Sequence, residues 1–390
     1  MEYIFQRQIL LANFVSSSFN FVFFLLASIL LNSHGASINE VALILGASNL
    51  VAAIFQPLIG RFTDIGKIKS VAVVAFILNS VGVFLLSSLN LFILTTASSL
   101  ILISSAVVQT ISSRSLEGLS SPENRGQMAS LNYMLSNLGY AISSILAYFF
   151  LRKNQTLLLF LDVITTGVAC FTIGYYGATQ KFKNSNTVVK TKDIELEQDF
   201  KWPDIIRTPR IWAVMFATLP IFMCLASSFS IVQVIFSEKG LDYIKLSTVV
   251  VGISSVAVII GYYTLKVLKP NDSVKIIGGG LLLGVGVMLL SCTTNLIDCL
   301  IFSVVWSLGE ILIIGEASTI FYKVIPAEYP GLAAGLKVGT LRLAFVICPL
   351  LITILGRITT FNLTLSLSIP CLVGAIWLYK LKVAKSNLSL

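Results

Sequence analysis

Long apolar blocks, separated by short polar connectors, make up most of this 390-residue chain. Each block is close to 20 residues long, the length at which a helix crosses the hydrocarbon core of a bilayer. The blocks lack the alternation of a half-buried strand, and backbone groups have no water partner in lipid, so the blocks predict membrane-spanning helices. Twelve such helices are expected, at 9–31, 40–60, 70–88, 91–113, 128–150, 156–177, 211–236, 246–267, 274–291, 297–320, 331–354 and 361–382.

One hydrophilic segment divides the twelve blocks into two sets of six. Residues 178–210 contain KFKNSNTVVKTKDIELEQDFKWPDIIRTPR, which is rich in both signs of charge and predicts a solvated linker. We therefore expect a six-helix half at 1–177, a cytoplasmic linker at 178–210 and a second six-helix half at 211–390.

A short repeat indicates that the two halves are related. The pattern G-x-x-A-x-L occurs twice, each time shortly after a proline and an acidic residue in the connector before the fifth or the eleventh block. Its residues are Gly126, Ala129 and Leu131 in the first copy and Gly331, Ala334 and Leu336 in the second. Because the copies occupy matching positions, we infer a duplication, and repeated halves are how many secondary transporters build a binding site near the middle of the bilayer.

Composition and charge agree with a membrane protein. Hydrophobic residues make up 56% of the chain and charged residues 12%, whereas a soluble domain carries about 25% charged residues. The net charge of +9 does not predict nucleic-acid binding, because the basic residues lie mostly in the short connectors. With the N-terminus in the cytoplasm, twenty Lys and Arg fall on the inner side and five on the outer side. This bias predicts an inner or plasma membrane protein with both termini cytoplasmic.

The sequence offers little for catalysis. Its six cysteines lie in or beside apolar blocks without a CxxC pair, and His34 is the only histidine, so neither a metal site nor a disulfide framework is indicated. No nucleophile–base pair or phosphate loop is evident either. We expect a protein that is not an enzyme and has no cofactor, with the proton gradient as its energy source.

Four ionisable residues lie inside the tenth and eleventh blocks: Glu310, Glu316, Lys337 and Arg342. At 1.5 Å of rise per residue, Glu310 and Arg342 reach similar depths near the midplane, while Glu316 and Lys337 lie nearer the cytoplasm. We therefore expect two ion pairs, Glu310 with Arg342 and Glu316 with Lys337. Charges in lipid are costly and tend to be functional, so Glu310 is the candidate for proton exchange. Arg342 is the candidate for adjusting the pKa of Glu310 or for binding an anionic substrate group. The alternative is that the pairs only hold neighbouring helices together.

The connector after the second block reads PLIGRFTDIGKIKS, and it is similar to the signature loop of the major facilitator superfamily. Gly60, Asp64, Gly66 and Lys67 match the pattern of that loop, although Ile65 stands where the family usually has an arginine. The resemblance covers nearly the whole chain, and it implies an all-α membrane protein with two pseudo-symmetric six-helix bundles and transport by alternating access. It also implies that Asp64 helps to latch the halves in the outward-open state.

The same resemblance implies that the first, fourth, seventh and tenth helices line a central cavity. Polar residues in the first three of these blocks are the candidates for substrate contact: Asn13, Ser17, Asn20, Gln109 and Gln233. The alternative for each is a hydrogen bond between helices.

The low charge of the expected cavity and the likeness to drug and metabolite efflux branches favour one function. We expect proton-coupled export of a small amphipathic organic molecule, either a drug or an endogenous metabolite such as a siderophore. One alternative is a proton symporter or facilitator that imports a nutrient, and another is a transport-inactive membrane receptor. The expected partners are the substrate, protons and the lipid bilayer, with no nucleic acid, and the expected state is a monomer.

Overall fold

The structure, a computed structural model, describes residues 2–86, 90–118, 120–150, 154–179, 207–355 and 360–386. These ranges contain helices and connecting turns but no strand. The first six long helices are α1 (Glu2–Ser33), α2 (Ile38–Asp64), α3 (Ile68–Leu85), α4 (Leu91–Ser113), α5 (Pro122–Phe150) and α6 (Gln155–Thr179), with a π-helical turn η1 (Arg114–Gly118) continuing α4.

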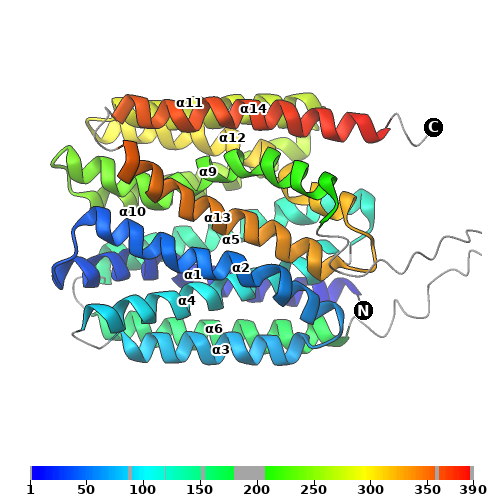
Figure 1. Cartoon of the computed structure of the whole chain (residues 1–390), viewed down its shortest axis with the longest axis horizontal. Coiled ribbons are helices and arrows are strands. Elements are labelled where there is room, and N and C mark those ends of the chain that lie inside the picture. Colours follow the sequence, from blue (N-terminus) through cyan, green and yellow to red (C-terminus); the bar gives the residue numbers. More distant parts are fainter. Residues whose placement is uncertain are drawn as a thin grey trace, which may run out of the picture.

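The second set repeats this arrangement. It comprises α9 (Pro209–Glu238), α10 (Tyr243–Leu268), α11 (Gly279–Cys292), α12 (Leu296–Val324), α13 (Pro330–Leu355) and α14 (Thr360–Ser386), with a π-helical turn η2 (Val274–Gly278) leading into α11. The start of α1 and the end of α14 lie at the same end of the bundle (Figure 1). We call this end the termini end.

Ten of these helices are long and apolar enough to cross a membrane, which confirms the prediction of an all-helical membrane protein. Helices α1 and α5 are not among the ten, and α5 carries polar side chains such as Asn132 and Ser136, which bind Asn13 of α1. Several helices extend beyond their predicted blocks: α5 begins at Pro122 and α12 ends at Val324. An apolar block marks only the part of a helix that lies in lipid, so the polar ends of the helix are not predicted from it.

Local signals set several helix ends. Ser37 and Glu40 form a capping box at the start of α2, and Asn295 and Asp298 form another at the start of α12. Such side chains satisfy backbone N–H groups that have no partner in the first turn of a helix. The turn between α2 and α3 contains Gly66 at a φ of +86°, a conformation that side chains other than glycine rarely adopt.

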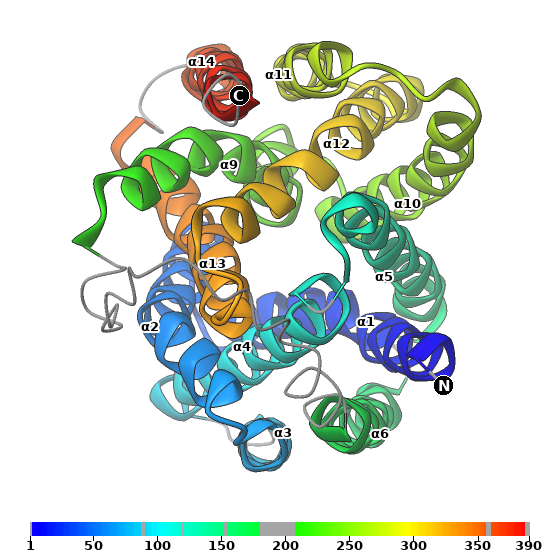
Figure 2. The same ribbon diagram turned by 90° about the vertical axis from the view of Figure 1, so that its right-hand side faces the viewer.

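Contacts between helices repeat from one half to the other. Helix α1 packs on α5 and α6 as α9 packs on α13 and α14, and α3 packs on α4 and α6 as α11 packs on α12 and α14. The halves meet along two seams, α2 with α13 and α5 with α10 (Figure 2). Helix α2 of the first half corresponds to α10 of the second, and α5 corresponds to α13. The two seams are therefore equivalent pairs, as a duplication predicts. The domain boundaries stay a prediction, and the linker lies outside the described residues apart from its ends.

The two seams are packed differently. A Cβ atom on Gly60 of α2 would overlap the carbonyl oxygen of Gly331 on α13, and one on Gly335 would overlap the carbonyl oxygen of Gln56. Small residues let helix backbones approach this closely. At the termini end of α5, by contrast, a Cβ on Gly126 would meet nothing within 4 Å. The α2–α13 seam therefore tolerates no added atom at these glycines.

Candidate functional site

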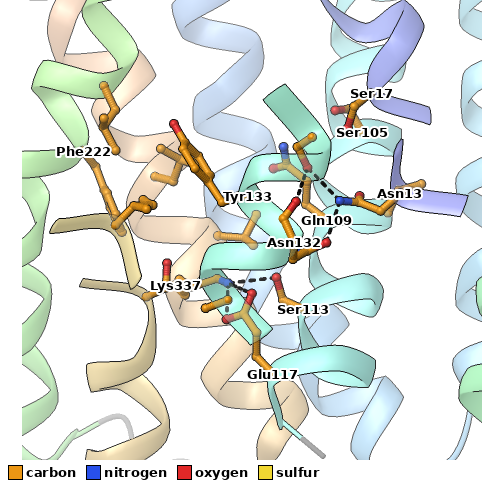
Figure 3. Close-up of a pocket in the computed structure, with 18 of the residues that line it drawn as sticks. Asn13, Ser17, Ser105, Gln109, Ser113, Glu117, Asn132, Tyr133, Phe222 and Lys337 are labelled. Carbon is orange, nitrogen blue, oxygen red and sulfur yellow. Dashed lines mark hydrogen bonds and ion pairs between the residues drawn. The ribbon is translucent and has the colours of Figure 1, made fainter. Parts of the chain in front are cut away.

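A cavity of about 150 Å³ lies between the two halves, lined by residues of α1, α4, α5, α9, α12 and α13 and of the turn η1 (Figure 3). Apolar side chains such as Phe222, Leu341 and Phe345 supply much of its wall. A few polar and charged groups converge on the same space, which is the usual composition of a small-molecule site.

Glu310 of α12 forms part of this wall. Its side chain is 3% exposed, and its Oε1 accepts a hydrogen bond from the hydroxyl of Tyr133 on α5. Its Oε2 has no hydrogen-bond partner. None of the ion pairs among the described residues includes Glu310. The cavity therefore contains a carboxyl group that belongs to one half and is bound by a phenol of the other.

Arg342 of α13 also lines the cavity and is 3% exposed. Its Nη1 donates to Asn49 Oδ1 at 3.2 Å, and its Nη2 donates to Ser105 Oγ at 3.2 Å and Gln109 Oε1 at 3.0 Å. All three acceptors are neutral side chains of the first half. The guanidinium carbon lies 6.0 Å from the centre of the Phe345 ring, and Nε has no partner.

Lys337, one and a half helical turns before Arg342, has a different environment. Its Nζ lies 2.7 Å and 2.8 Å from the carboxylate oxygens of Glu117 and donates to Ser113 Oγ at 2.8 Å (Figure 3). Glu117 lies in η1 of the first half, so this buried ion pair joins the halves at the cavity. The sequence did not predict Glu117 as a site residue, because the segment RSLEG (114–118) follows the fourth apolar block and has the composition of a polar connector.

The two ion pairs expected from depth are wrong. Glu310 and Arg342 share the cavity but bind other partners, and Glu316 pairs with Lys382 at 2.6 Å and Lys275 at 3.8 Å. Depth does not specify which side of a helix a residue occupies. Six residues rotate a helix by about 240°, so Glu310 and Glu316 face different neighbours, and Glu316 points to α14 and η2 instead of the cavity.

Three of the five polar candidates line the cavity: Asn13, Ser17 and Gln109 (Figure 3). Asn13 donates from Nδ2 to Asn132 Oδ1 and Ser136 Oγ, both at 2.8 Å. Gln233 is buried on α9 but is not among the cavity-lining residues. The side chain of Asn20 lies outside those that the structure describes.

Helix α5 supplies lining residues that sequence reasoning missed, including Tyr133 and Tyr140. The family resemblance implied that the first, fourth, seventh and tenth helices line the cavity, and the charged candidates Lys337 and Arg342 added the eleventh, but no residue of the fifth was expected there. The low hydropathy of α5 was the available signal, because polar side chains on a spanning helix need partners or water.

The latch residues Gly60, Asp64, Gly66 and Lys67 lie at the termini end of α2 and in the following turn. The Asp64 carboxylate accepts hydrogen bonds from the backbone N–H groups of Gly331 at 2.6 Å and Leu332 at 2.9 Å, in the first turn of α13. A carboxylate at a helix N-terminus satisfies free N–H groups and interacts favourably with the helix dipole. Asp64 thus caps a helix of the opposite half, whereas Lys67 lies 5.7 Å from the Phe62 ring.

The corresponding connection of the second half makes no such contact across the seam. Asp272 pairs with Lys382 at 2.8 Å, inside its own half. Partial burial acts to raise the pKa of Asp272, but the hydrogen bond and charge of Lys382, with the charges of Lys275 and Lys323, lower it on balance. The two halves therefore use their equivalent connections differently.

A comparison with protein-family models matches residues 9–349 to the Major Facilitator Superfamily. No curated protein sequence matches the chain. Among solved structures, the human organic anion transporter MFSD10 (TETRAN) is similar over 96% of this chain and 99% of its own, with a TM-score of 0.71 and 14% identity.

Two further structures share the fold. A bacterial homologue of the iron transporter ferroportin, in an outward-facing state, matches over 97% of this chain and 99% of its own, with a TM-score of 0.70 and 14% identity. A POT family transporter in complex with a thioalcohol-conjugated peptide matches over 95% of each chain, with a TM-score of 0.66 and 15% identity. Such identities establish the fold alone; together with the family match, they show that this multi-pass membrane protein belongs to the Major Facilitator Superfamily, a family of transporters.

Proposed function

We propose that this chain is a secondary transporter that couples proton movement to the export of a small amphipathic organic molecule by alternating access. The observation that carries the proposal is the Glu310 carboxyl group, which is buried in the cavity between the halves and belongs to none of the ion pairs among the described residues. The apolar walls of the cavity favour an amphipathic substrate.

The environment of Glu310 supports a role in coupling. A buried charge without a partner costs several kcal/mol, and a proton removes that cost. Because Tyr133 belongs to the first half and Glu310 to the second, gain or loss of the proton changes a contact between the halves. A proton at this site would therefore bias the arrangement of the halves, as coupling requires.

We assign the termini end to the cytoplasm of a cell with an inner or plasma membrane, on the basis of the excess of Lys and Arg in connectors at that end. The Asp64 cap then closes the cytoplasmic end of the seam. Release of this cap would admit substrate from inside the cell.

The test is transport into everted vesicles with an imposed pH gradient, followed by mass spectrometry of the vesicle contents. Three naphthalene probes of similar size serve as substrates: 1-naphthalenesulfonate, the neutral 1-naphthalenesulfonamide and the cationic trimethyl-1-naphthylammonium. We expect Glu310→Gln to reduce gradient-driven uptake at least tenfold without loss of folded protein. Glu316→Gln, the same change on the same helix outside the cavity, should retain coupling. Undiminished gradient-driven uptake in Glu310→Gln would refute the role of Glu310.

A second candidate, import by proton symport, is favoured by the shared location of Glu310 and Arg342. A proton on Glu310 would leave Arg342 as the uncompensated charge of the cavity, so a proton and an anion would each favour binding of the other. Right-side-out vesicles with the same gradient separate the candidates. Uptake stronger there than in everted vesicles would favour import, and no transport in either orientation would favour a transport-inactive receptor.

A further inference from the structure

Arg342 is a buried cation whose hydrogen-bond partners are all uncharged. Asn49, Ser105 and Gln109 accept from its two Nη atoms, and its Nε has no partner. The ion pairs among the described residues do not include Arg342. The guanidinium is therefore held in place by dipoles, and no described residue serves as its counter-ion.

Lys337 shows that the same cavity can provide a counter-ion. Its ammonium group lies on the same helix as Arg342 and contacts the Glu117 carboxylate at 2.7 Å. Glu310, the other carboxyl group of the cavity, is bound by Tyr133 and does not pair with Arg342. An unpaired buried ion carries a large desolvation penalty, and neutral hydrogen bonds offset only part of it.

We infer that the transported molecule carries a single, singly charged anionic group, a carboxylate, sulfonate or phosphodiester, which binds the Arg342 guanidinium. This inference rests on the proposed transport through the cavity and adds the charge of the substrate. Guanidinium groups bind pairs of oxyanion oxygens with directed, charge-assisted hydrogen bonds. The apolar part of the substrate packs against Phe222, Leu341 and Phe345 of the same cavity.

The surroundings of Arg342 favour selective binding of one kind of anion as well as attraction of anions in general. Ser105 and Gln109 hold Nη2 from α4, and the Phe345 ring lies beside the guanidinium, so the fork is oriented before the ligand arrives. A second anionic group would find Lys337 already neutralised by Glu117. Among the described lining residues, Arg342 is thus the one cation outside an ion pair, which suits a monoanion better than a dianion.

Thermal unfolding of the purified full chain in detergent tests the inference without any gradient. A ligand that binds only the folded state stabilises it by RT ln(1 + [L]/Kd), so the midpoint should rise with 1-naphthalenesulfonate and much less with the sulfonamide or the ammonium probe. In Arg342→Gln, at least a tenfold higher concentration of 1-naphthalenesulfonate should be needed for the same rise in the unfolding midpoint. Arg342→Lys, which keeps the charge but not the fork, should weaken the sulfonate response less.

Arg125→Gln is the control, because Arg125 is a partly buried arginine of α5 that does not line the cavity, and its guanidinium donates only to the backbone carbonyl groups of Glu117, Ser120 and Tyr322 among the described residues. It should leave the sulfonate response unchanged. Equal stabilisation by the three probes, no stabilisation by any of them, or a full response in Arg342→Gln would each overturn the inference. If Arg342→Gln does not fold, the probe comparison and Arg342→Lys still decide. This binding assay is independent of coupled transport, so either result can fail while the other stands.

Discussion

Replacing Asp64 with asparagine should open the seam between α2 and α13 at the termini end. The change keeps the size of the side chain but leaves one amide oxygen to serve two N–H groups, those of Gly331 and Leu332. A hydrogen bond to a charged group contributes about 1.5–3 kcal/mol, and the charge–dipole term adds about 0.3–1 kcal/mol. A loss of about 2–3 kcal/mol favours the open state by roughly 30- to 150-fold.

Alkylation of a cavity cysteine measures this shift. Ser318 lines the cavity from α12, and Ser318→Cys can be placed in a Cys292→Ser background because Cys292 is the exposed cysteine among the described residues. A membrane-impermeant maleimide applied from the termini end should label the Asp64→Asn protein tens of times faster than the parent. Asp272→Asn is the matched control, since Asp272 occupies the equivalent connection but binds Lys382 within its own half.

The result that would refute this reasoning is specific. Equal labelling rates in Asp64→Asn and its parent would mean that the cap does not hold the seam closed. Equal acceleration by Asp272→Asn would mean that negative charge at this end of the bundle, and not the cap across the seam, controls opening.

The remaining predictions concern the seams and the buried ion pair. Gly331→Ala should lower the thermal unfolding midpoint because its Cβ would overlap the backbone of Gly60, whereas Gly126→Ala, the equivalent change in the repeat, should not; equal effects of the two would contradict the packing argument. Lys337→Gln should destabilise the protein by about 3–5 kcal/mol by leaving Glu117 as an unpaired buried charge. Adding Glu117→Gln should recover most of that loss in the same unfolding assay, and a double variant no more stable than the single one would show that the pair itself is needed.

The sequence was sufficient to predict the helices, because a block of about 20 apolar residues has few alternatives in lipid. It also placed Asp64 in the connector after the second block, where the loop around Gly60 and Gly66 carries a local pattern, and the structure has Asp64 as the last residue of α2. Both predictions rest on residues that lie close together in the sequence. Contact of Asp64 with the start of α13 depends on the fold, and the family resemblance implied only that Asp64 helps to latch the halves.

The depth of each charged residue in the membrane was not enough to predict which buried charges form ion pairs. Ion pairs depend on which side of each helix faces which neighbour, and a block that is apolar all round gives little information about that side. The six-residue spacing of Glu310 and Glu316 did exclude a shared face. Glu117 was missed because a π-helical turn carries α4 beyond its apolar block and places a connector residue in the cavity wall.

The unequal packing of the seams has an evolutionary consequence. After a duplication, two equivalent connections start under equal selection, but a backbone contact without space for a methyl group accepts almost no substitution at Gly60, Gly331 or Gly335. The looser seam, where Gly126 has open space, leaves its connection free to accumulate changes. The connection after α10, residues 265–275 (LKVLKPNDSVK), lacks the glycine–aspartate pattern found at Gly60 and Asp64, which is the drift expected of the copy released from that constraint. Mutational scanning of both connections should find the first intolerant of substitution and the second permissive.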